Sequence, residues 1–211
     1  GWDMRVLLPA YRALRAEYAD WPQVFVEADL FGGTGRVLAS EVAGISVLLL
    51  DAPHLFDREG GPYSGANGDH PDNPERFAAL SWVAAQIARR GLSDGWRPQI
   101  LHAHDWQAGL APAYLAYGAP CDVASVMTVH NIAFQGWAGA GLLSTLRLPR
   151  GEFHAEGLEY YGGLSTLTAG LITADAITVK GPLGTLKQTL KGDVEIKLDD
   201  GKITFKAANS S

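Results

Sequence analysis

The chain of 211 residues has a single cysteine, Cys121, and no long apolar run. One cysteine excludes an internal disulfide and a four-cysteine zinc site. We expect Cys121 to be a small buried or half-buried side chain without a chemical role. No apolar stretch approaches the ~18–20 residues needed to cross a bilayer. No basic-then-apolar leader opens the chain, so nothing indicates export. Together these absences predict a cytoplasmic protein.

Lysine is absent from residues 1–178, whose eleven basic residues are all arginine. Residues 179–211 show the reverse, with six lysines and no arginine. All six tryptophans lie in the first segment, which also has 19 of the 23 acidic residues. One gene under one codon bias is not expected to sort arginine and lysine in this way. We therefore predict two domains from unrelated sources, 1–178 and 179–211, with a short tail that is lysine-rich by chance as the alternative.

Short apolar runs alternate with amphipathic stretches throughout the first segment. The predicted strands are 4–11, 97–105, 122–130 and 176–181, and residues 23–38 and 43–53 are expected to form two strands around a Gly-rich turn. The predicted helices are 73–91, 106–118 and 162–175. Strands that alternate with helices predict an α/β fold with a Rossmann-like, mostly parallel sheet and helices on both of its faces.

The tail has a different pattern. Residues 194–199 alternate apolar and polar side chains with a period of two, and no helical spacing is present. The dipeptide Asp200-Gly201 is a strong signal for a hairpin turn. We expect an appended antiparallel β segment over residues 179–211.

Polar side chains follow two neighbouring strands of the predicted sheet. His102, His104 and Asp105 end one strand, and His130 and Asn131 end the next. In open α/β sheets, ligands bind outside the carboxyl ends of the strands. Two polar strand ends at the same edge therefore predict a functional site rather than isolated structural histidines.

Two chemistries fit these residue types. A metal site would use His102, His104 and His130, with Asp105 as a further ligand, and would suit a hydrolase. A sugar site would use the same groups as hydrogen-bond donors and acceptors for hydroxyls. A carboxylate would also help to stabilise an oxocarbenium-like sugar when a nucleotide departs.

A loop rich in glycine and proline, residues 60–77, has Tyr63 near its start. Loops at a sheet edge often carry function, and a tyrosine ring there can stack on a pyranose. A solvent-exposed loop with an anchoring tyrosine is the alternative.

Several blocks of the first segment, above all HAHDWQAGLAPAYLA and TVHNIAFQG, resemble the N-terminal catalytic domain of bacterial glycogen (starch) synthase. The resemblance extends over residues 2–178. It implies retaining transfer of glucose from ADP-glucose to an α-1,4-glucan, in a cleft between two Rossmann-like domains, with no metal or other cofactor. It also implies that His130 contacts the donor glucose and that Asp105 and Tyr63 line the cleft and matter for turnover. His104, Asn131 and Gln135 are implied as further substrate-binding residues.

The chain departs from the family pattern in three respects. It begins after the family's first strand and its phosphate-binding loop, and it lacks the second domain. Thr166 and Thr168 replace a phenylalanine and a lysine, and Ile172 and Thr173 replace two aromatic residues, where the second domain would face. We therefore expect a sheet without the family's first strand, no glucose transfer, and at most weak binding of glucan or sugar.

The tail resembles the N-terminal β-ribbon of the large-subunit ribosomal protein L-six, with VKGPLGTL as the shared core. Six lysines against four acidic residues are too weak an electrostatic signal to predict RNA binding by the tail alone. We expect its strands to extend the sheet or to pair between two chains. The function that follows is a fragment of a glycogen synthase joined to an unrelated β segment. A structural chimera without a ligand and a metal-dependent hydrolase are the alternatives.

Overall fold

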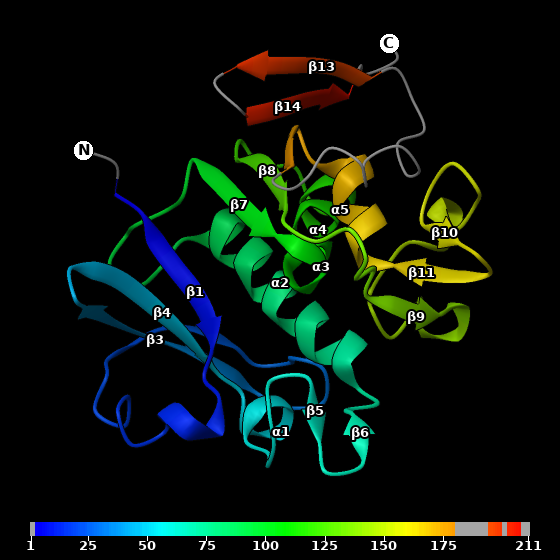
Figure 1. Ribbon diagram of the computed structural model, residues 1–211. Helices are drawn as coiled ribbons and strands as arrows, with labels where there is room; N and C mark the ends of the chain where they lie inside the picture. Colours follow the sequence, from blue (N-terminus) through cyan, green and yellow to red (C-terminus); the bar gives the residue numbers. More distant parts are fainter. Residues whose placement is uncertain (1–2, 180–193, 200–201, 208–211) are drawn as a thin grey trace. The chain divides into compact units, whose positions relative to one another are not determined.

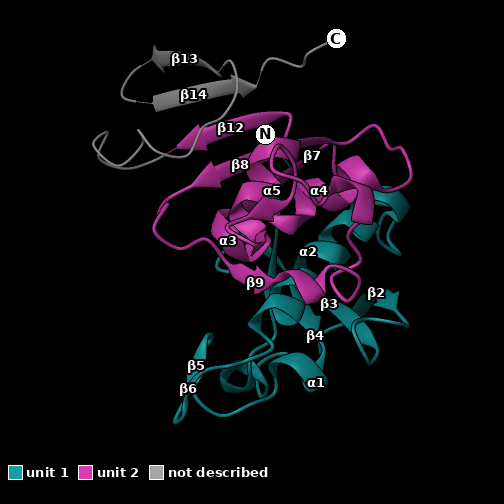
Figure 2. Cartoon of the chain, turned by 90° about the vertical axis from the view of Figure 1, so that its right-hand side faces the viewer, with its two compact units in different colours: residues 1–97 teal, residues 98–211 magenta. Residues whose placement is uncertain are grey.

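The structure is a computed structural model that describes residues 3–179 and the backbone of residues 194–199 and 202–207 (Figure 1). Its contacts divide the chain into two compact units, residues 1–97 and residues 98–211 (Figure 2). Both units combine strands with helices, which agrees with the predicted α/β class. Each unit is described by itself below.

The first unit is built on a four-stranded sheet with the order β1-β4-β3-β2. Its strands are β1 (Arg5–Pro9), β2 (Gln23–Glu27), β3 (Gly35–Val42) and β4 (Ile45–Asp51). Only β1 and β4 pair in parallel, and the other neighbours are antiparallel. The prediction of two strands over residues 23–53 was wrong. The chain reverses twice there, because Ala43 and Gly44 form a second turn with positive φ angles.

Helix α2 (Asn73–Arg90) packs on this sheet. On one face of this helix, Phe77, Val83 and Ile87 are buried. The last two share a core with Val37 of β3 and Leu50 of β4, so burial of one helix stripe joins the helix to the sheet. Shorter elements complete the unit: η1 (Arg12–Leu14), α1 (Pro53–Phe56), β5 (Ser64–Gly65) and β6 (Gly68–Asp69).

The second unit contains a five-stranded sheet with the order β13-β14-β12-β8-β7. Strands β7 (Ile100–His104), β8 (Ala124–Val129) and β12 (Ala176–Val179) pair in parallel, as predicted for the first segment. The helices of this unit are α3 (Asp105–Ala108), α4 (Leu110–Tyr117) and α5 (Thr166–Thr173). The predicted helix over 106–118 is thus divided into α3 and α4, with Gly109 between them.

The tail forms the predicted hairpin of β13 (Val194–Asp199) and β14 (Lys202–Ala207). The turn dipeptide Asp200-Gly201 and the VKGPLGTL core beyond Val179 lie outside the described residues. Strand β14 pairs antiparallel with β12, with Ile177 opposite Phe205. The tail therefore extends the sheet beside β12, which is one of the arrangements expected from the sequence.

A small sheet with the order β10-β11-β9 lies in the same unit. Its strands are β9 (Trp137–Gly139), β10 (Glu159–Tyr160) and β11 (Gly163–Ser165), and η2 (Ala140–Leu142) and η3 (Arg150–Glu152) lie between β9 and β10. The helix predicted over 162–175 therefore begins only at Thr166. In the described part of the chain, no helix is long and apolar enough to cross a membrane.

The interpretation of Thr166 as part of a surface for a second domain was wrong. Thr166 is only 3% exposed, and its hydroxyl donates a hydrogen bond to the main-chain oxygen of Trp106 at 2.7 Å. The absence of side chains at Gly109 and Gly136 lets the start of α5 approach them closely, because a Cβ atom at either glycine would collide with Thr166. Ile172, by contrast, is exposed.

Candidate functional site

The carboxyl ends of β7 and β8 lie side by side. The parallel register places His102 opposite Val126 and His104 opposite Thr128. The residues that follow each strand, Asp105 and His130, therefore leave the sheet at the same edge. We call Asp105, His104, His130 and Asn131 the strand-end cluster.

Asp105 holds this cluster together through the backbone. Its Oδ1 accepts hydrogen bonds from the main-chain N–H groups of His130, at 2.6 Å, and of Asn131, at 3.2 Å. Asp105 also has a φ of 53°, a left-handed conformation that is uncommon for residues other than glycine. This backbone turns its carboxylate toward the end of the neighbouring strand. Such strain is frequent at functional sites.

The three histidines form a stacked row on the exposed side of the sheet. The rings of His102 and His104 have centroids 4.3 Å apart, and those of His104 and His130 are 5.4 Å apart. Nδ1 of His104 lies 3.1 Å from Nε2 of His130, so the N–H of one ring donates a hydrogen bond to the nitrogen of the other. Nε2 of His102 is hydrogen-bonded to the hydroxyl of Thr128 at 2.6 Å. Both His104 and His130 are exposed to solvent.

This row does not fit the metal hypothesis. The ring nitrogens bond to one another and to Thr128 rather than converging on a common point. Among residues with described side chains, no group of three or more His, Cys, Asp or Glu is arranged to hold a metal ion. The arrangement suits hydrogen bonding to a polar ligand better than metal coordination.

The loop after β8 is fixed from both of its ends. The side chain of Asn131 accepts a hydrogen bond from the N–H of Ala133 at 3.0 Å. The Gln135 amide donates to the carbonyl of Ile132 at 2.7 Å. The hydroxyl of Ser165, which caps α5, lies 2.9 Å from both oxygens of Gln135. Gln135 therefore has a clear role inside the loop, where it shapes the loop rather than pointing into solvent.

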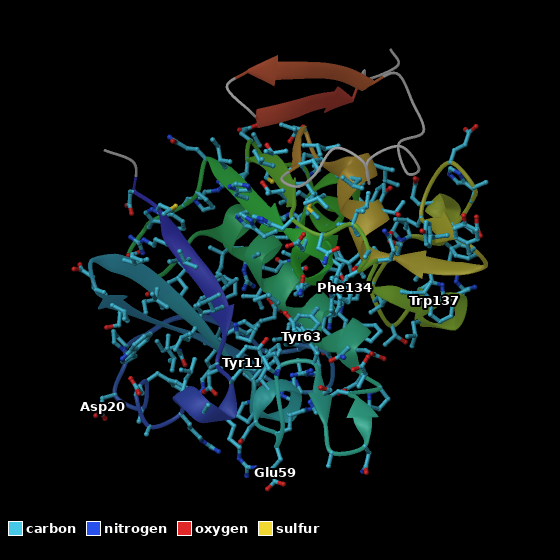
Figure 3. All side chains as sticks on the ribbon, in the orientation of Figure 1. Tyr11, Asp20, Glu59, Tyr63, Phe134 and Trp137 are labelled. Carbon is cyan, nitrogen blue, oxygen red and sulfur yellow. The ribbon has the colours of Figure 1, made fainter. Side chains whose placement is uncertain are left out.

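Tyr63 belongs to the first unit, so the structure does not place it relative to the strand-end cluster. Its side chain is 44% exposed, and its ring lies 5.7 Å from that of Phe77. Its main-chain oxygen accepts hydrogen bonds from the side chain of Asn73, at 2.8 Å, and from the N–H of His70, at 2.9 Å. Tyr63 is labelled in Figure 3.

The sequence reasoning missed Arg76, which anchors the loop that contains Tyr63. It is fully buried, and it donates hydrogen bonds to the carbonyls of Leu55 and Pro62 and to the side chain of Asn73. Burial lowers the pKa of its guanidinium, which nevertheless stays positive because its ordinary value is so high. The sequence contained a signal for this buried role, because Arg76 stands next to Phe77 on the apolar side of a helix that is otherwise rich in alanine.

Comparison with known proteins now adds an independent finding. A family model described as the starch synthase catalytic domain matches residues 1–182. The chain belongs to this family. The recognition of the glycogen synthase N-terminal catalytic domain from the sequence is thereby confirmed for the first segment, whereas the ribosomal resemblance of the tail stays a prediction.

Individual relatives of this starch synthase domain are close in sequence. A glycogen synthase of Cereibacter sphaeroides is 69% identical over 182 residues, which is 86% of this chain and 38% of that protein. A glycogen synthase of Paracoccus denitrificans is 50% identical over 183 residues, with 39% of its length covered. The chain thus spans less than two fifths of these relatives.

A solved structure shows the same fold. The catalytic domain of starch synthase IV from Arabidopsis thaliana, determined with ADP and acarbose, superposes with a TM-score of 0.67 over 82% of this chain and 36% of that one. The sequences are 22% identical, so this similarity speaks for the fold alone.

Proposed function

We propose that this starch synthase domain is part of a retaining glucosyltransferase of the glycogen synthase type, and that the strand-end cluster forms one wall of its sugar site. The observation that carries this proposal is the carboxylate of Asp105, which binds two successive amides and fixes an exposed imidazole pair at the sheet edge. Strained backbone held by such bonds is typical of a preorganised site.

Each residue has a separate role in the proposed site. His130 contacts the donor glucose, and His104 orients the His130 ring through their hydrogen bond. Asp105 is a positioning residue, because both bonds of its Oδ1 go to the backbone that carries His130. Asn131 and Gln135 shape the loop, and Tyr63 is proposed as a further sugar-contacting residue on the strength of the family resemblance. ADP and acarbose in the related Arabidopsis structure support ADP-glucose and α-1,4-glucan as the ligands.

We further propose that this chain alone binds sugar weakly and does not transfer glucose. Departure of a nucleoside diphosphate requires positive charge near the phosphates. The strand-end cluster offers imidazoles, an amide and a carboxylate. Between residues 98 and 179 the only arginines are Arg147 and Arg150, neither of which belongs to the ends of β7 or β8, and there is no lysine.

The proposal includes a junction near Thr178 between this domain and a β segment of other origin. The family match ends at residue 182, close to the point where lysine replaces arginine. Kinship of the tail with a ribosomal β-ribbon, pairing of tail strands between chains, and a cytoplasmic location are parts of the proposal that rest on sequence alone.

The experiment follows the His130 imidazole by NMR while ADP-glucose or maltose is added to the 211-residue chain. We expect shifts of the His130 ring signals at millimolar sugar, and no glucose transfer from ADP-glucose to glycogen. Asp105→Asn weakens the response, whereas Asp122→Asn, which neutralises an exposed aspartate away from the cluster, leaves it unchanged. If the His130 ring signals do not shift, the sugar site is rejected. Measured transfer of glucose to glycogen would reject the inactivity of the chain.

A further inference from the structure

The small sheet β10-β11-β9 has aromatic rings gathered on one face. Gly163 of β11 is paired with Tyr160 on one side and with Gly139 on the other. Directly opposed residues of antiparallel strands point to the same face, so these three residues share it. Trp137 lies on that face too, because it precedes Gly139 by two positions in the same strand. We call Trp137, Tyr160 and Tyr161 the aromatic face.

Gly163 provides the floor for the tryptophan. A Cβ atom at this glycine would lie 2.7 Å from Cε2 and Cζ2 of Trp137, so the indole rests directly on the backbone of the middle strand. The ring is nevertheless 58% exposed. Trp137 is labelled in Figure 3. One side of the indole is thus supported by the sheet, and a large part of its area stays available to a ligand.

Tyr161 is held at the end of the sheet in a strained conformation. It precedes Gly162 in the two-residue turn between β10 and β11, and both residues have positive φ angles, 49° and 78°. Turns of this kind favour Asn, Asp or Gly at the first position. Tyr161 is 88% exposed, and its ring meets the ring of Tyr160 edge-on at 4.8 Å. A bulky side chain that is both strained and 88% exposed contributes little to a buried core, which favours a role in binding.

We propose that the aromatic face binds a chain of α-1,4-linked glucose outside the strand-end cluster. This rests on the proposed function, since it takes a glucan as the ligand of the domain. The apolar C–H face of a pyranose stacks on an aromatic ring, while its hydroxyls stay in water or bond to the tyrosine hydroxyls. A row of rings over a glycine floor, at the surface of a short sheet, offers such stacking to successive sugars of a polymer.

The size of the face favours a glucan over a protein partner. The three strands have two, three and three residues. A stable protein interface buries about 800 Å² on each partner, which is far more than three rings on so short a sheet supply. A few exposed rings suffice for a weak and repetitive polymer ligand, for which several contacts add through multivalency.

The test titrates maltoheptaose, a soluble α-1,4-glucan, into the 211-residue chain and follows the indole N–H of Trp137 by NMR. Trp137→Ala should weaken binding about tenfold, and Trp137→Phe, which keeps a ring on Gly163, should largely retain it. Tyr161→Asn is the decisive variant. It places the preferred residue in the turn, so the melting temperature should rise by about 1–3 °C while maltoheptaose binding falls.

Three results would overturn the proposal. The first is an indole signal of Trp137 that does not respond to maltoheptaose. The second is unchanged maltoheptaose binding in both Trp137→Ala and Tyr161→Asn. The third is weaker binding by Tyr161→Asn together with a lower melting temperature. The two proposals separate because each has its own reporter. His130→Ala should leave the Trp137 response intact, and Trp137→Ala should leave the His130 response to ADP-glucose intact.

Discussion

The Tyr63 loop, residues 57–72, and the strand-end cluster are each anchored by a charged side chain, but the two anchors have opposite charges. Each must hold an exposed side chain in place although the backbone around it is irregular. In the Tyr63 loop, donors from Arg76 and Asn73 bind the carbonyls of Pro62 and Tyr63. In the strand-end cluster, the carboxylate of Asp105 binds the amides of His130 and Asn131.

The difference lies in how deeply the anchor is buried. Arg76 is fully buried, whereas Asp105 is half-buried and next to solvent. Water can partly replace a lost anchor at the surface, but it cannot do so in the core. Loss of Arg76 should therefore affect the stability of the first unit, and loss of Asp105 should act mainly on the local order of the cluster.

The largest effect is expected for Arg76→Met. The substitution keeps an apolar stem of similar length but leaves the carbonyls of Leu55 and Pro62 without their donor, which should cost about 2–4 kcal/mol. Urea denaturation measures this loss. The matched control is Arg90→Met on the same helix, where a half-exposed guanidinium loses its bonds to Glu27 and to the carbonyl of Val26, and less than about 1 kcal/mol is expected. Equal effects of the two substitutions would show that burial of the anchor is not decisive.

Asp105→Ala should have the next largest effect, about 2 kcal/mol. It removes an acceptor for two amides and leaves alanine with a positive φ angle. Hydrogen exchange at the amides of His130 and Asn131 should accelerate. Asp105→Asn keeps an oxygen acceptor and tolerates this backbone, so exchange should change less. Unchanged protection in the alanine variant would mean that the carboxylate is not the anchor.

Sequence reasoning predicted which polar residues lie together better than how they are held. Parallel strands bring their carboxyl ends to one edge, so the meeting of His104, Asp105 and His130 followed from strand prediction alone. The positive φ of Asp105 could not be predicted, because no local pattern marks it. The carboxylate thus turned out to bind backbone amides, a contact that depends on the neighbouring strand.

The errors in the fold have a similar origin. Residues 23–53 contain three strands instead of the two predicted, because the chain turns both at Phe31-Gly32 and at Ala43-Gly44. Thr166 was assigned to the surface because its departure from the family pattern was judged without its neighbours. In the structure Gly109 and Gly136 make room for it, a packing relation between residues distant in sequence.

A smaller effect is expected for Asn73→Ala, about 1 kcal/mol. The side chain donates to the carbonyl of Tyr63 and accepts from Arg76, and both bonds lie at the edge of the loop. The amide of His70, which bonds the same carbonyl of Tyr63, should exchange faster. Asn73→Asp keeps the acceptor for Arg76 but removes the donor, so it separates the two contributions. If both variants exchange like the parent, the loop is held by Arg76 alone.

The smallest effect concerns the pH dependence of the Tyr63 loop. Burial acts to raise the pKa of Asp72, but two hydrogen bonds from Arg58, at 2.6 and 2.7 Å, and its charge outweigh burial and lower the pKa. A carboxylate with a lowered folded-state pKa stabilises fully above its unfolded value, about 3.9, and this stabilisation is lost as pH falls through the folded-state pKa.

The Tyr63 loop should therefore open more readily on acidification below pH ~4, although only modestly, because Arg58 and Asp72 are both partly exposed. Limited proteolysis by an acid-active protease between pH 5 and 2.5 measures the opening. Asp72→Asn should remove the dependence, whereas Asp69→Asn, at an exposed position of the same loop, should keep it. An acid-induced opening that persists unchanged in Asp72→Asn would show that the pair of Arg58 and Asp72 does not hold the loop.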